Sequence, residues 1–93
     1  PPQNPPSPSK DLINYPNNFG DYAYIYLENR GVKSIRFVAE FEQKPPGMDT
    51  IPPGKPMNFN VLLKPKESTV YKFRIVDQEA YQGIGYSYHL ESK

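Results

Sequence analysis

Residues 20–29, GDYAYIYLEN, decide the fold of this chain. Three tyrosines alternate there with three apolar residues, in the order Tyr22, Ala23, Tyr24, Ile25, Tyr26 and Leu27. Successive side chains of a β-strand point to opposite faces. The stretch therefore predicts a strand with one wholly apolar face and one face that carries three phenols, and it raises the question of what covers the phenols.

The same period of two recurs along the rest of the chain. After the first strand at 23–28, the predicted strands are 33–42, 57–63, 69–77 and 84–90. The side chains expected to face the core are Ile35, Phe37, Ala39, Phe41, Met57, Phe59, Val61, Leu63, Tyr71, Phe73, Ile75, Ile84, Tyr86, Tyr88 and Leu90. No segment has the i, i+3, i+4, i+7 apolar spacing of a helix.

Turn residues separate these strands. Asn29-Arg30-Gly31 predicts a tight hairpin, because Asn and Gly both tolerate positive φ. Two Pro-Pro-Gly units, at 45–47 and 52–54, predict a stiff loop that crosses from one sheet to the other. The segment 77–83 is expected to be a loop with one helical turn at 78–81.

Short strands separated by Pro and Gly predict an all-β fold, an antiparallel immunoglobulin-like sandwich of about five to seven strands. The order of Asn29-Arg30-Gly31, then 51–55 (IPPGK), Phe59-x-Val61 and 70–77 (VYKFRIVD) resembles that of immunoglobulin-like modules of surface proteins. Such patterns are architectural, so they imply no particular function.

The first 18 residues have a different composition. Six of the twelve prolines lie there, at Pro1, Pro2, Pro5, Pro6, Pro8 and Pro16. Proline fixes φ near the polyproline II value and has no N–H, so we expect an extended arm or linker over 1–18 and a β-sandwich domain over 19–93. Within the arm, 11–15 (DLINY) is a candidate short edge strand.

Composition limits the classes of function. A chain of 93 residues without cysteine offers one small domain with no disulfide, thiolate nucleophile or Cys-based zinc site. A net charge of +1 argues against a dedicated nucleic-acid binder. The sequence contains no run of 18 apolar residues, so it predicts no transmembrane helix. Since the sequence starts on Pro1 rather than Met, we expect a processed chain that acts outside the cell or at its surface.

Candidates for catalysis and metal binding are few. Ser87 and His89 point the same way on the last strand, but a solvent-facing pair is the simpler interpretation. Glu40 with Glu42 resembles a polar outer face. Asp77 with Glu79 is a weak candidate for calcium, because no EF-hand pattern surrounds it. We therefore predict no enzymatic activity, no cofactor and no metal site.

Two further motifs have simple alternatives. The basic residues Lys64, Lys66, Lys72 and Arg74 form either an anion-binding patch or a solvated strand face and turn. Residues 5–10 (PPSPSK) fit the P-x-x-P-x-K pattern of SH3 ligands, a pattern that arises often in proline-rich segments.

The proline-rich arm is a candidate to contact the three tyrosines. Polyproline II segments dock on aromatic surfaces at low entropic cost. The predicted binding residues are Tyr22, Tyr24, Tyr26, Pro5, Pro6, Pro8 and Leu12. The arm either folds back over the three tyrosines, reaches onto a neighbouring molecule, or links to another domain and leaves the tyrosines free to bind another partner.

The sequence thus favours a non-enzymatic binding or structural module. It would act as an adhesive surface or assembly component, through a protein partner or through self-association by the arm. The alternative is a carbohydrate-binding or accessory domain of a larger secreted protein, although the absence of Trp, the strongest stacking side chain, weighs against sugar binding.

Overall fold

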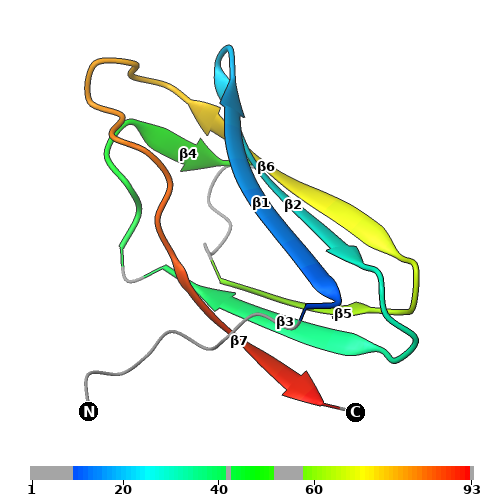
Figure 1. Cartoon of the computed structure of the whole chain (residues 1–93). Coiled ribbons are helices and arrows are strands. Elements are labelled where there is room, and N and C mark those ends of the chain that lie inside the picture. Colours follow the sequence, from blue (N-terminus) through cyan, green and yellow to red (C-terminus); the bar gives the residue numbers. More distant parts are fainter. Residues whose placement is uncertain (1–9, 42, 52–57, 93) are drawn as a thin grey trace.

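The computed structural model describes residues 10–41, 43–51 and 58–92. In this part of the chain the fold is all-β, with two antiparallel sheets and no helix (Figure 1). The strands are β1 (Leu12–Phe19), β2 (Tyr22–Asn29), β3 (Ile35–Glu40), β4 (Met48–Thr50), β5 (Phe59–Leu63), β6 (Ser68–Ile75) and β7 (Ser87–Ser92). The all-β prediction is therefore confirmed.

The strands form a four-stranded sheet in the order β1-β2-β6-β4 and a three-stranded sheet in the order β5-β3-β7. In the first sheet Tyr24 lies opposite Asn17 on β1 and Lys72 on β6. In the second, Val38 lies opposite Asn60 on β5 and His89 on β7. These registers decide which side chains share each outer face.

The core lies between the two sheets and is filled by the residues that the alternation predicts to point inward. Its fully buried members include Ile25 and Leu27 from β2, Phe37 from β3 and Leu63 from β5. Aromatic rings connect the layers: Phe59 of β5 stacks on Tyr71 of β6 with ring centroids 4.1 Å apart. Such pairs stabilise beyond the area that they bury.

The predicted hairpin at Asn29-Arg30-Gly31 is wrong, because β2 and β3 lie in different sheets. Asn29 is fully buried, and its side chain fixes the crossing. Its Nδ2 donates to the carbonyls of Lys33 and Leu63, at 2.8 and 2.9 Å, while its Oδ1 accepts from the Gly31 N–H at 2.9 Å. The hairpin lies instead between β1 and β2, where Gly20 has a φ of 62°.

The prediction that the loop with two Pro-Pro-Gly units connects strands of different sheets is wrong, because β3 and β5, the strands before and after it, pair in one sheet. Between them the chain adds to the other sheet a short strand that the sequence did not suggest. This strand, β4, pairs with the end of β6 and places Met48 opposite Ile75. Gly47 precedes it with a φ of 77°, and a Cβ there would lie 2.5 Å from the Asp77 carbonyl oxygen. Only glycine fits this close approach.

Two smaller predictions are confirmed. The edge strand expected at 11–15 exists as β1, which runs further, to Phe19, and tolerates Pro16 because it lies at the sheet edge. The loop after β6 contains one turn, in which the Tyr81 N–H donates to the Asp77 carbonyl at 3.1 Å. Met57 and Glu42 lie outside the described residues.

Candidate functional site

The three tyrosines of β2 lie on the outer face of the four-stranded sheet. Alternate residues of β2, from Ala23 to Asn29, are buried, so Tyr22, Tyr24 and Tyr26 point away from the core and are half-buried among their neighbours. The alternation in the sequence predicts this placement correctly.

Neighbouring strands widen this row of tyrosines into a surface. Directly opposite residues of antiparallel strands share a face. The outward residues on β1, β2 and β6, here called the aromatic face, are Tyr15, Asn17, Phe19, Tyr22, Tyr24, Tyr26, Val70, Lys72 and Arg74. The alternation in the sequence indicates only the three tyrosines of β2, because the contribution of β1 and β6 depends on strand pairing.

The aromatic face is open to solvent. Phe19 is 78% exposed, Tyr15 59% and Val70 53%. Contiguous apolar surfaces of this kind on a small domain usually mark an interaction site. Pro5, Pro6 and Pro8 lie outside the described residues, so their contact with the face stays a prediction. Leu12 lies in the core at the start of β1, away from the solvent.

Charged groups hold the side chains of the aromatic face at both ends. The Lys72 Nζ lies 4.9 Å from the centroid of the Tyr22 ring, at cation–π distance. At the other end, Tyr26 Oη donates to Glu28 Oε1 at 3.0 Å, and Arg30 Nε lies 3.3 Å from Glu28 Oε2. The hydrogen bonds from Arg30 and Tyr26 lower the pKa of Glu28.

The Ser87–His89 pair is brought to one outer face of the other sheet, but its side chains contact different groups. Ser87 Oγ lies 3.5 Å from the Glu40 carbonyl oxygen, at the limit of a hydrogen bond. His89 Nε2 lies 3.6 Å from Glu91 Oε2. Both residues are exposed. A pocket of about 440 Å³ has Ser87 in its lining but not His89.

Asp77, of the weak calcium candidate Asp77 with Glu79, has a structural role. Asp77 Oδ1 accepts hydrogen bonds from the backbone N–H groups of Glu79 and Ala80, at 3.1 and 3.3 Å, and so caps the single turn. In the described part of the chain no group of three or more His, Asp or Glu side chains is placed to hold a metal ion.

The basic residues do not form one patch. Lys72 and Arg74 belong to the aromatic face, whereas Lys64 and Lys66 lie in the turn between β5 and β6. The Lys66 Nζ donates to the Arg30 carbonyl at 2.9 Å. The solvated face and turn describe these positions better than a single anion site does.

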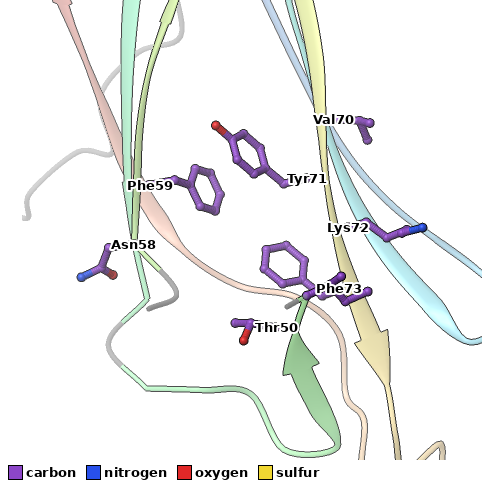
Figure 2. Close-up of a pocket in the computed structure, with 8 residues that line it drawn as sticks. Thr50, Asn58, Phe59, Val70, Tyr71, Lys72 and Phe73 are labelled. Atoms are coloured by element: carbon purple, nitrogen blue, oxygen red, sulfur yellow. The ribbon is translucent and has the colours of Figure 1, made fainter. Parts of the chain in front are cut away.

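A pocket of about 380 Å³ opens between the sheets beside β5 and β6. Figure 2 shows Phe59, Tyr71 and Phe73 pointing into this space, whereas Val70 and Lys72 point to the opposite side of β6. Burial raises the pKa of the Tyr71 phenol. The pocket has an aromatic floor, and the polar residues Thr50 and Asn58 also line it.

No protein-family model, curated protein or solved structure matches this chain. Function must therefore be inferred from the surface geometry. Within residues 10–41, 43–51 and 58–92, no helix is long and apolar enough to cross a membrane.

Proposed function

We propose that this domain is a non-enzymatic binding module that contacts another protein through the aromatic face. The observation that carries the proposal is the exposure of Phe19, Tyr15 and Val70 around the three tyrosines of β2. Aromatic residues and Arg are enriched in the cores of protein interfaces. A broad, open sheet surface suits a protein partner better than a small molecule, which is usually enclosed.

The division of the strands into sheets of four and three supports an immunoglobulin-like sandwich, an architecture common in surface proteins. We therefore propose a structural or adhesive role in a surface assembly. The proline-rich arm is part of this proposal, as a cover for the aromatic face or as a second contact.

The arm is tested by removing residues 1–9, which leaves β1 intact. Light scattering on the full and shortened chains should show less self-association after removal if the arm reaches a neighbour. Equal masses at every concentration would contradict a reaching arm.

Sugar binding is the competing function, and one contact weighs against it. The Lys72 ammonium lies over the Tyr22 ring, so that face of the ring is not free to stack on a sugar. A glycan array probed with the wild type and with Tyr24→Ala should show no tyrosine-dependent signal. A glycan that the wild type binds and Tyr24→Ala does not bind would favour the carbohydrate-binding alternative.

Site-specific photo-crosslinking in the producing cells tests the protein-binding proposal. A photoreactive phenylalanine analogue is placed at Tyr24, on the aromatic face, or at Val38, on the outer face of the other sheet. We expect a discrete protein adduct from position 24 only, and we expect Tyr15→Ser/Phe19→Ser to remove it. An adduct from position 38 alone, or one insensitive to that double variant, would contradict the proposal.

A further inference from the structure

The free edges of the two sheets differ in how they are protected against pairing with another strand. An edge strand presents unpaired N–H and C=O groups, and proteins usually guard it with proline, charge or short length. β1 contains Pro16, β4 has only three residues, and β7 carries His89 and Glu91. Each of these edges has one of the usual guards.

The edge strand β5 has none of these guards. Its five residues, Phe59-Asn60-Val61-Leu62-Leu63, contain neither proline nor charge. On one side β5 pairs with β3, and among the described residues no strand pairs with its other side. Leu62 is 38% exposed, while Phe59 and Val61 are only half-buried.

Among the described residues, the core is also open along this edge. The 380 Å³ pocket borders Phe59, Tyr71 and Phe73, and β4 pairs with β6 only from Phe73 to Ile75. An added strand beside β5 would extend the sheet past the pocket and cover apolar side chains that now face water.

We propose that β5 pairs with β5 of a second copy of this chain, antiparallel and about a two-fold axis. Sheet alternation allows only registers that keep core-facing residues on one side. The register that pairs all five residues places Val61 opposite Val61 of the second copy and Phe59 opposite Leu63. On the outer face Asn60 lies opposite Leu62, so no like charges meet.

A second copy fits this edge because the strand is complementary to itself. Its apolar inward residues meet apolar residues, and its neutral outward residues meet neutral ones, in one continuous six-stranded sheet. Such a contact is isologous and closes after two copies. Five paired residues bury a small area, so the dimer is weak and depends on concentration.

This contact is independent of the proposed function, because β5 and the aromatic face belong to different sheets. Sedimentation velocity over a concentration series tests it. The wild type should approach twice the monomer mass as concentration rises, and Asn60→Lys/Leu62→Lys should remain monomeric because lysines then face each other across the axis.

A charge-swapped partner makes the test specific to the register. Asn60→Glu/Leu62→Glu should also remain monomeric alone, and an equimolar mixture of the two double variants should form a heterodimer. The matched control is Ser87→Lys/His89→Lys, which adds the same charges to the β7 edge and should still dimerise. Circular dichroism checks that each variant is folded.

Three outcomes would overturn the pairing: a wild type that is monomeric at every concentration, a dimer that survives in both double variants, or a folded mixture that fails to associate. A dimer lost in Phe19→Ser and retained in the β5 variants would move self-association to the aromatic face. That result would refute the β5 pairing and leave the proposed function standing.

Discussion

The two sheets have the same inward chemistry and opposite outward chemistry. Both fill the core with alternating apolar residues. Outward, the three-stranded sheet presents a polar face, in which Arg36 contacts Asn60 at 2.8 Å and Glu91 at 3.8 Å. The four-stranded sheet presents the aromatic face, where Phe19 is 78% exposed.

The difference between the faces shows which residues folding does not require. A sheet needs one buried face, and the polar face shows that this architecture can leave its other face hydrated. Phe19, Tyr15 and Val70 bury little surface in the isolated domain, so they add little to its stability. Their exposure is better explained by a partner.

The largest expected effect separates core aromatics from face aromatics. Phe37 is fully buried between the sheets, so Phe37→Ala should lower the free energy of unfolding by about 4 kcal/mol. The same change at exposed Phe19 should shift it by no more than about 0.5 kcal/mol. Urea unfolding measures both, and a large loss at Phe19 would show that the aromatic face is structural.

Asn29 is the next test, because both faces depend on the crossing that it fixes. Asn29→Ala leaves the Lys33 and Leu63 carbonyls and the Gly31 N–H without this partner, so stability should fall by about 3 kcal/mol. Asn17→Ala, on the aromatic face, is the exposed control and should cost little. Equal losses in the two variants, by thermal unfolding, would contradict the role of Asn29.

Three partly buried phenols predict a loss of stability at alkaline pH. Burial raises the pKa of Tyr71, Tyr81 and Tyr86 in the folded state. Their contribution is therefore complete below the unfolded tyrosine pKa of about 10 and is lost as pH rises through the folded values. Urea unfolding should become easier above about pH 10.

Tyr86→Phe removes one of these groups and should make the alkaline loss shallower, whereas Ser87→Ala should not. Tyr86→Phe also loses the 2.6 Å hydrogen bond from Tyr86 Oη to Asn14 Oδ1, so its stability is lower at neutral pH as well. An unchanged pH slope in Tyr86→Phe would show that burial of this phenol is not coupled to folding.

The smallest effect is expected on the polar face. Arg36→Ala removes a partly exposed hydrogen bond and an ion pair, which together contribute less than about 1 kcal/mol. High salt should reduce the difference between Arg36→Ala and the wild type. A salt-insensitive loss of several kcal/mol would mean that the polar face is structural in a way that its exposure does not indicate.

Local alternation predicted most of the strands and the faces of their side chains, because that information lies within each segment. The order in which the strands pair within each sheet did not follow from this alternation. Asn29 resembled a turn residue, since only the fold brings the Leu63 carbonyl to its side chain. Phe19 and Val70 joined the aromatic face through the register with β2, which no single segment encodes.

The affinity of the cross-linked partner for two matched variants tests the central claim most directly. Tyr15→Ser/Phe19→Ser alters the aromatic face, and Val38→Ser/Leu62→Ser replaces two outward apolar residues of the polar face. Calorimetric titration should show Kd weakened at least about 30-fold by the first, corresponding to about 2 kcal/mol, and unchanged by the second. Equal affinities for the first variant and the wild type would contradict the claim that the aromatic face is the contact surface.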